Sequence, residues 1–343
     1  MRLLDSKLYK ADLEKAVKKA DLEKLDGKSI FITGGLGLIC SAVIDVLLTY
    51  GNVKKIYVGA RDETQFFERF GEIDKLSFVK YDALEKLQID FIPDYIIHGA
   101  GLASPELYTS MPVETILSNL NGIHFLLEFA KKNNIKKILY ISSSEVYGNK
   151  ETIESFVEGK YGIINIDNIR SSYSIAKRAS EMLCKSYSQE YGVNTTIVRP
   201  GHIFGPSARK TDKRISSDFA FKAAKGIKLE MKSSGLQKRS YCYSIDCSIQ
   251  ILYALINGVN GDVYNIGHDK ITTVREMAEI YAKAGGVKIS SVSPTESELN
   301  DFNPMNNSSL DNTKIKKLGY SDTFTVEEGL THTVKIIKEI NCF

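Results

Sequence analysis

Tryptophan is absent from this chain of 343 residues, proline occurs only 7 times, and neither sign of charge dominates. The 45 Lys and Arg residues against 42 Asp and Glu residues give a formal net charge of +3, which does not favour a polyanion-binding surface, so we expect no nucleic-acid partner. No apolar run approaches the roughly 20 residues of a membrane span, and the charged N-terminus is not built like a signal peptide. We therefore predict a cytoplasmic protein with no membrane partner.

Cysteine is also sparse. The 5 cysteines are odd in number and show neither Cys-x-x-Cys nor mixed Cys/His ligand spacing, and none of the 5 histidines falls in a metal-binding spacing. These absences argue against a disulfide framework, and we predict no metal site. A composition with 43% hydrophobic and 25% charged residues is typical of a folded globular chain.

Short apolar runs alternate with helical stretches along much of the chain. Each run is rich in Ile, Val, Phe and Tyr and is bounded by Gly, Asp or Lys. The runs occupy residues 29–33, 55–60, 76–82, 94–100, 136–143 and 195–200. Continuous apolar strands between helices are typical of a parallel sheet covered on both faces, so the pattern predicts an α/β fold with a Rossmann-type doubly wound sheet.

A glycine-rich turn follows the first of these runs. It contains Gly34 and Gly37, and Leu38 and Ile39 then open an apolar helix. Glycines suit a turn in which a cofactor pyrophosphate approaches a helix N-terminus, so we predict that these four residues bind a dinucleotide. Cys40 stands where a third glycine would allow close packing, so we expect this helix to lie slightly farther from the sheet.

The end of the second run leaves the cofactor open between two forms. We expect NAD, but the acidic residue that would hold its ribose 2′-hydroxyl is missing, since the run ends in Arg61 and Asp62 comes late. Arg61 could instead accept a 2′-phosphate, so NADP stays open. Asp82, after the third run, is a candidate for the adenine edge or for a helix cap.

A second constellation is Tyr173 with Lys177. A spacing of four places both side chains on one face of a helix, where a Lys ammonium would lower the phenol pKa and make the tyrosine a general base. The upstream apolar run delivers Ser143, Ser144 and Glu145 to the carboxyl end of a strand, where such folds bind ligands.

Taken together, the motifs resemble a known family. The stretches TGGLGLI, HGAG (with Ala100), SSSEVYG, YSIAK and VRPGHIFGP, with Asn119, are similar in order and spacing to the extended short-chain dehydrogenase/reductases of the NAD-dependent epimerase/dehydratase family, which act on nucleotide-diphosphate sugars. The resemblance implies that Tyr173 is the base, that Lys177 also holds the nicotinamide ribose, that Ser143 bonds the sugar O4, and that Ala100 lies at the cofactor. It further implies a homodimer.

The residues around Glu145 bear on the branch of the family. In 4,6-dehydratases the pattern is Thr-Asp-Glu before Val-Tyr-Gly, whereas Ser144 stands here in place of the Asp. This version is similar to the UDP-glucuronate decarboxylases. Arg214 and Arg239 resemble substrate-site arginines of that branch. The resemblance implies an enzyme that forms a transient 4-keto sugar and then loses CO2, with Glu145 managing the C5 proton and Ser144 at the substrate. A 4-epimerase, a 4-ketoreductase, a 4,6-dehydratase and a non-enzymatic nucleotide-sensing subunit remain alternatives.

These motifs suggest three segments. Residues 1–26 carry an amphipathic helical pattern and form an N-terminal extension that either packs on its own domain or makes a dimer contact. Residues 27–206 form the NAD(P)-binding Rossmann domain. Residues 207–343 form mainly a smaller C-terminal substrate-binding lobe, with some segments returning to the Rossmann sheet.

Overall fold

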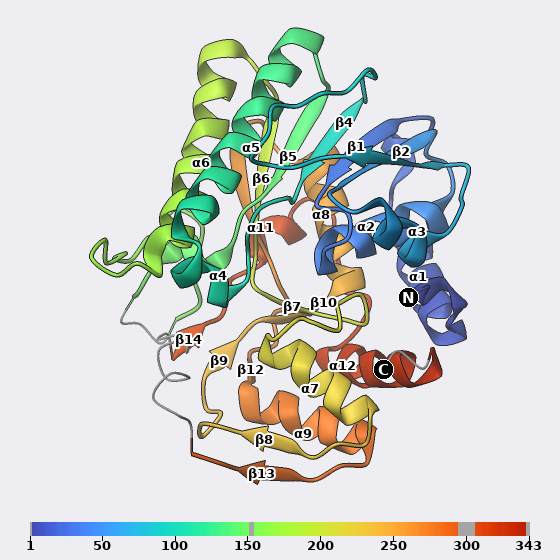
Figure 1. Cartoon of the computed structure of the whole chain (residues 1–343), viewed down its shortest axis with the longest axis vertical. Helices are drawn as coiled ribbons and strands as arrows, with labels where there is room; N and C mark the ends of the chain where they lie inside the picture. The colour runs from blue at the N-terminus through green and yellow to red at the C-terminus, as the bar shows by residue number, and fades with distance from the viewer. Residues whose placement is uncertain (1, 151–153, 294–305, 341–343) are drawn as a thin grey trace.

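A computed structural model describes residues 2–150, 154–293 and 306–340. Its centre is a seven-stranded sheet in the order β11-β6-β5-β4-β1-β2-β3, with every neighbouring pair parallel (Figure 1). The strands are β1 (Ser29–Thr33), β2 (Lys55–Ala60), β3 (Leu76–Lys80), β4 (Tyr95–His98), β5 (Lys137–Ile141), β6 (Thr195–Pro200) and β11 (Asp262–Ile266). The predicted doubly wound α/β fold is confirmed.

Helices cover both faces of the sheet (Figure 1). One face carries α2 (Leu38–Tyr50), α3 (Glu63–Phe70) and α8 (Ser244–Asn257), and the other carries α4 (Pro105–Ser110), α5 (Pro112–Asn133) and α6 (Ser171–Tyr191). Within these layers α2 packs along α8 and α5 packs along α6. With both faces covered, the sheet needs the continuous apolar strands that the sequence supplies.

The strand β11 was not identified from the sequence. It lies at the edge of the sheet beside β6, although the chain between these two strands runs through much of the smaller lobe. The helix α8, which precedes it, also packs on the sheet, against β5 and β6. The chain therefore leaves the sheet after β6 and returns to it with α8 and β11.

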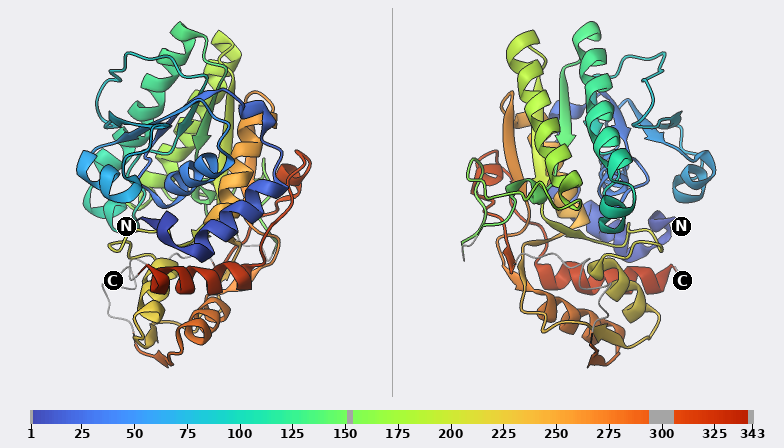
Figure 2. Two further views of the ribbon diagram at one scale, coloured as in Figure 1. Left: turned by 90° about the vertical axis from the view of Figure 1, so that its right-hand side faces the viewer. Right: turned by 60° about the vertical axis from the view of Figure 1, so that its left-hand side comes forward.

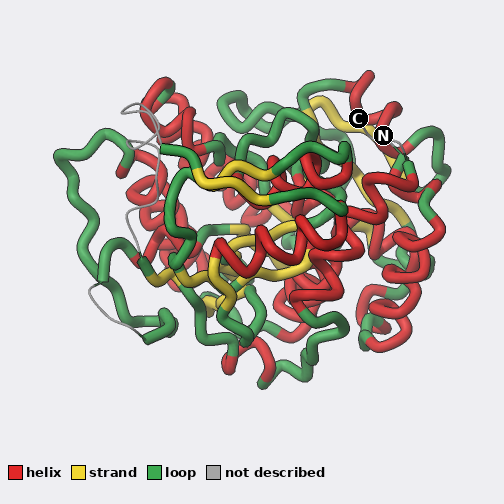
Figure 3. The backbone as a smooth tube through the Cα atoms, turned by 90° about the horizontal axis from the view of Figure 1, so that it is seen from below, coloured by secondary structure: helices red, strands yellow, loops and turns green. Residues whose placement is uncertain are grey.

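The smaller lobe lies at the carboxyl edge of the sheet, and its described residues include the helices α7 (Ile215–Ala224), α9 (Val274–Gly285) and α12 (Val326–Glu339). Its strands are short: β8 (Leu229–Met231) pairs with β13 (Ile289–Ser291), and β9 (Lys238–Arg239) pairs with β12 (Thr272–Thr273) and β14 (Asn307–Ser308). Figure 3 views this lobe from below. β7 (His202–Phe204) pairs with β10 (Tyr241–Tyr243) where the chain enters the lobe.

The N-terminal segment forms a short 3-10 turn, η1 (Leu3–Asp5), the helix α1 (Lys7–Lys19) and a second turn, η2 (Glu23–Leu25). The apolar side of α1 is buried against α2, α8 and α12 (Figure 2). The Tyr9 hydroxyl donates a 2.8 Å hydrogen bond to Asp45 of α2, and Asp12 accepts a 3.0 Å bond from Tyr243 of β10. The segment is thus bonded to a helix that covers the sheet and to β10, where the chain enters the smaller lobe.

The described cysteines, Cys40, Cys184, Cys242 and Cys247, are buried free thiols. Burial raises the pKa of the Cys40 thiol to about 12, so this group is an unreactive packing residue. Cys342 lies outside the described residues. Among the helices that the structure describes, none is both long and apolar enough to cross a membrane.

Candidate active site

The glycine-rich loop between β1 and α2, residues 34–37, presents mainly backbone atoms because three of its four residues are glycine, and we call this surface the cradle. Gly34 has φ +70°, and a Cβ on it would lie 2.8 Å from backbone atoms of Gly99 and Ala100, so only glycine fits. Gly37 precedes α2, and none of the described side chains caps its first turn. The amides that open this helix at Leu38 are therefore available to an anion, and the cradle fits a dinucleotide pyrophosphate.

Cys40 is accommodated on the far side of this loop. A Cβ built on Gly99 would lie 2.4 Å from the Cys40 Sγ, so the sulfur occupies the space that Gly99 leaves free. The larger side chain at the third-glycine position is thus matched by a glycine after β4. This compensation comes from a different element, so the sequence of α2 alone does not predict it.

The acidic residues after β2 and β3 act as local caps. The Asp62 carboxylate accepts the backbone N–H of Gln65 at 2.9 Å and the Gln65 side-chain amide at 2.8 Å, which fixes the start of α3. Asp82 accepts the N–H of Leu84 at 3.0 Å and stabilises the turn after β3. Arg61 lies between β2 and α3 and is exposed.

Tyr173 and Lys177 lie one turn apart on α6 and are both buried. The Lys177 Nζ donates a 2.8 Å hydrogen bond to the carbonyl oxygen of Ile141, the last residue of β5, and lies 5.7 Å from the centre of the Tyr173 ring. The helix spacing and the contact with the end of β5 thereby hold the two side chains close together.

The ionisation of this pair differs from the sequence-based expectation. Burial, followed by the charge of Glu145, raises the pKa of Tyr173 to about 12, although hydrogen bonds from Ser143 and Tyr108 act to lower it. Burial lowers the pKa of Lys177 to about 7. Burial is thus the largest influence on the pKa of both groups, and it favours the neutral form of each.

Glu145 lies in η3 (Ser144–Tyr147), which Ser143 caps and which begins three residues after the end of β5. Its carboxylate accepts hydrogen bonds of 3.1 and 3.0 Å from the two terminal nitrogens of Arg170 and one of 3.2 Å from the Ser174 hydroxyl. Both charged side chains are only 18% exposed. Arg170 was assigned no role from the sequence, although its place three residues before Tyr173, at the start of α6, was an available signal.

Tyr108 is a second residue that the sequence analysis missed. Its ring stacks on the Tyr173 ring at a centroid distance of 4.3 Å and an interplanar angle of 6°. The Ser172 hydroxyl donates a 2.9 Å hydrogen bond to the Tyr108 carbonyl oxygen, which joins α4 to α6. No local pattern marks Tyr108, because its role depends on how α4 is placed against α6.

The two predicted substrate-site arginines come from the smaller lobe. Arg214 forms a salt bridge with Asp212 at 2.5 Å, and its charge contributes to lowering the pKa of Tyr173. Arg239 is buried in β9. After burial, the charges of Arg239 and then Arg214 lower the pKa of His202 to about 3, which places both arginines around β7 at the boundary between sheet and lobe. Ser144 is buried at the start of η3.

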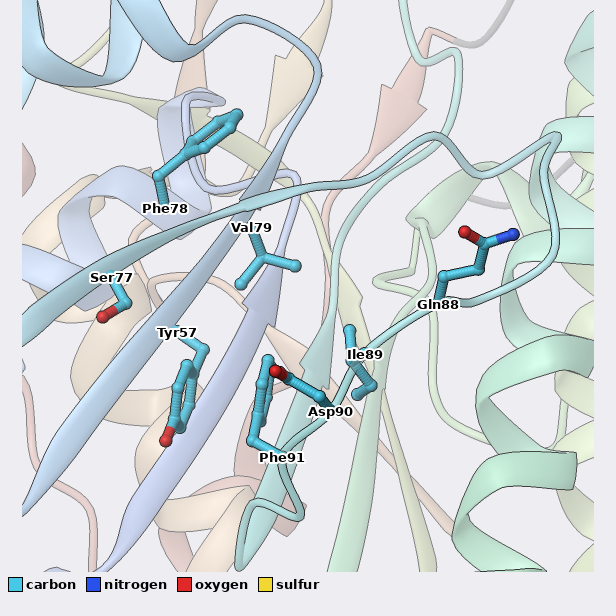
Figure 4. A pocket seen from close by; sticks show the side chains of 8 residues that line it. All are labelled: Tyr57, Ser77, Phe78, Val79, Gln88, Ile89, Asp90 and Phe91. Atoms are coloured by element: carbon cyan, nitrogen blue, oxygen red, sulfur yellow. The ribbon is translucent and has the colours of Figure 1, made fainter.

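A pocket elsewhere on the sheet contains none of these residues (Figure 4). It lies beside the edge strand β3, where the rings of Tyr57 and Phe91 stack at 3.6 Å. Its lining is completed by Ser77, Phe78, Val79, Gln88, Ile89 and Asp90. We assign it no part in the site around Tyr173.

The features on α2, β5 and α6 define a class of protein. A dinucleotide cradle opens at the carboxyl edge of a parallel sheet, beside a buried Tyr-x-x-x-Lys pair and Ser143, which acts to lower the pKa of the tyrosine. This combination is that of a short-chain dehydrogenase/reductase in its extended form, with a second lobe over the strand ends.

Comparison with known proteins gives the family. The model of the NAD dependent epimerase/dehydratase family matches residues 30–267, and the chain is an enzyme of this family. It is 31% identical over 309 residues to UDP-glucuronic acid decarboxylase 5 of Arabidopsis thaliana, covering 88% of this chain and 86% of that protein. It is 29% identical over 325 residues to UDP-glucuronic acid decarboxylase 1 of Xenopus tropicalis, covering 93% and 74%. The structure of UDP-glucose 4-epimerase with UDP-glucose from Thermotoga maritima superimposes with a TM-score of 0.78 at 25% identity, covering 91% of this chain and 99% of the epimerase.

Proposed function

We propose that the protein removes the C6 carboxylate of UDP-glucuronate as CO2, through a transient 4-keto sugar and with a nicotinamide dinucleotide as cofactor. The observation that carries the proposal is the Glu145 carboxylate held by Arg170 beside Tyr173, with Ser144 preceding it. The two relatives named UDP-glucuronic acid decarboxylase support the same reaction.

Position 144 separates this reaction from dehydration. Expulsion of a 6-hydroxyl group needs a carboxylic acid to protonate it, and a serine hydroxyl is far too weak an acid for that task. Decarboxylation requires no acid at this position, because CO2 leaves without a proton. The neutral, buried Ser144 therefore favours decarboxylation.

The substrate sugar is proposed to lie against Tyr173 and Ser143. Ser143 bonds the O4 hydroxyl, and Tyr173 takes the O4 proton as general base and returns it in the closing step. The dinucleotide, when bound, accepts the C4 hydride and later returns it, and the 4-ketone present in between lies β to the carboxylate, so that its oxygen can accept the electrons of the breaking bond.

The remaining site residues would bind the two ligands and control the C5 proton. The dinucleotide would be held by Gly34, Gly37, Leu38 and Ile39, with Ala100 opposite. Lys177 would bond its nicotinamide ribose. Glu145, fixed by Arg170, would direct the proton that C5 gains after CO2 leaves. Arg239 and Arg214 would bind the anionic diphosphate or carboxylate through their planar donor groups.

The test is incubation of the purified full chain with a panel of UDP-, GDP-, CDP- and dTDP-sugars, with NAD or NADP, and analysis of the products by mass. We expect UDP-glucuronate alone to lose the mass of CO2, and the variant Tyr173→Phe to lose activity by roughly 10²–10⁴-fold while retaining dinucleotide binding. Loss of water from a neutral hexose, or an epimer of unchanged mass, would replace the proposal by a dehydratase or a 4-epimerase.

We also propose that the protein is a homodimer that pairs through α5 and α6. The exposed apolar side chains on these helices include Val113 and Leu117 on α5 and Met182 on α6. A second copy would bury them in a helix-to-helix interface. Sedimentation should show a dimer that Met182→Glu dissociates, whereas a monomeric wild-type chain would overturn this point.

A further inference from the structure

Three basic side chains converge where the second strand of the sheet ends. Arg61 directly follows β2, and Lys80, the last residue of β3, donates a 2.5 Å hydrogen bond from its Nζ to the Arg61 carbonyl oxygen. Arg209 comes from the segment between β7 and α7, and its Nε donates a 3.2 Å hydrogen bond to the carbonyl oxygen of Leu36 in the glycine-rich loop. Two distant parts of the chain therefore place guanidinium groups at one rim of the dinucleotide cradle.

The backbone and the electrostatics both show that these groups are neighbours. The Gly35 amide donates a 3.2 Å hydrogen bond to the Gly59 carbonyl oxygen, so the end of β2 contacts the loop to which Arg209 is bonded. Burial lowers the pKa of the Arg209 guanidinium, and the positive charge of Arg61 lowers it further. Like charges brought together in this way favour an anion between them.

The carboxylates nearest to Arg61 and Arg209 are bonded to their own turns. Asp62, whose charge opposes the effect of Arg61 on Arg209, has both oxygens bonded to Gln65 as the cap of α3. Asp82 caps its own turn. Throughout the described parts of the chain, neither Arg61 nor Arg209 forms a salt bridge with a carboxylate.

We propose that the rim formed by Arg61 and Arg209, with Lys80 beside them, binds the 2′-phosphate of NADP, and that the enzyme prefers NADP to NAD. In a Rossmann fold the adenosine ribose lies at the end of the second strand, where an acidic residue accepts the 2′-hydroxyl of NAD and an arginine accommodates the 2′-phosphate of NADP. Guanidinium groups bind phosphate through paired, charge-assisted hydrogen bonds. The inference rests on the proposed function, because it names the cofactor of that reaction.

The first test is calorimetric titration of the full chain with adenosine 2′,5′-bisphosphate and with 5′-AMP, which differ only in the 2′-phosphate. We expect the bisphosphate to bind at least about tenfold more tightly, and added salt to narrow the difference. The mass of the dinucleotide released when the purified protein is denatured should be that of NADP. Equal affinities, or release of NAD, overturn the preference for NADP, whereas a chain that binds no dinucleotide overturns the proposed function itself.

The second test uses variants. Arg61→Gln and Arg209→Gln should each weaken the bisphosphate by about tenfold and leave 5′-AMP within about twofold, because only the 2′-phosphate contact is lost. Lys132→Gln, which removes one positive charge from the exposed end of α5, is the matched control and should change neither affinity. Arg61→Asp should reverse the preference toward NAD. An equal loss for both ligands in the arginine variants contradicts the proposal.

Discussion

Arg170 and Glu145 are joined by two hydrogen bonds, of 3.1 and 3.0 Å, from the two terminal nitrogens of one guanidinium to the two oxygens of one carboxylate. This geometry fixes the plane of the carboxylate as well as its charge, and a lysine cannot reproduce it. The pair lies at the N-terminal end of α6, three residues before Tyr173. If Glu145 directs the C5 proton, the rate of that proton transfer depends on the orientation of its carboxylate.

Arg170→Lys should therefore lower kcat by roughly 10–10²-fold with a smaller change in KM, because the charge stays and the orientation is lost. Steady-state kinetics with UDP-glucuronate measure both constants. Near-ultraviolet absorbance should show reduced nicotinamide accumulating, since the affected proton transfer follows oxidation at C4. Arg275→Lys, at an exposed arginine of the smaller lobe, is the control. A wild-type kcat in Arg170→Lys would show that Arg170 does not position the catalytic carboxylate.

The pH dependence should respond to Tyr108→Phe. The hydrogen bond from Tyr108 is among the contributions that lower the pKa of Tyr173, which burial raises to about 12. Phenylalanine keeps the stacked ring but removes the hydroxyl, so the pKa of Tyr173 rises and less phenolate is present at any pH. The acid limb of the kcat/KM profile should move to higher pH by up to about one unit. Tyr191→Phe, at an exposed tyrosine of α6, should leave the limb in place, and a shift to lower pH in Tyr108→Phe contradicts the assignment.

The cradle can be tested at Gly34. Gly34→Ala would place a Cβ 2.8 Å from the backbone of Gly99 and Ala100 at φ +70°. We expect a lower melting temperature and at least about a tenfold loss of dinucleotide affinity, because the loop must shift. Gly27→Ala is a matched control, since Gly27 has φ +66° but a Cβ added there would meet no atom of the described residues within 4 Å. The control should lose stability without losing dinucleotide affinity, and equal dinucleotide binding in both variants would count against the cradle.

The N-terminal helix should contribute to stability through Tyr9. Its hydroxyl donates to the buried Asp45, which also forms a salt bridge with Arg69. Tyr9→Phe should lower the free energy of unfolding by about 1–3 kcal/mol, because a buried carboxylate loses a donor. Urea denaturation measures this loss. Tyr50→Phe, which removes an exposed hydrogen bond to Asp26, should cost less, and equal costs would show that the buried contact is not stabilising.

Much of the sheet could be predicted from the sequence. The expected runs at 29–33, 55–60 and 195–200 coincide with β1, β2 and β6, because each is a short apolar strand bounded by turn residues or charges. β11 was missed because it follows β6 only after a long excursion through the smaller lobe. Its pairing partner is fixed by tertiary structure and leaves no local signal.

The site could be predicted where its residues share one element. Tyr173 and Lys177 lie on one helix, and Gly34 and Gly37 in one loop, so spacing alone relates them. Tyr108 and Arg209 contact residues of other elements, and no periodic pattern in the sequence predicts those contacts. The pKa of Tyr173 was also beyond sequence reasoning, because its burial depends on the whole fold.

The most direct measurement uses UDP-glucuronate labelled with heavy carbon at C6, incubated with the purified enzyme and dinucleotide. The label should appear in CO2 in a one-to-one ratio with an unlabelled UDP-pentose, and Tyr173→Phe should abolish both products together. A label retained in a six-carbon UDP-sugar, whether epimerised, reduced or unchanged, would contradict decarboxylation as the function of this site.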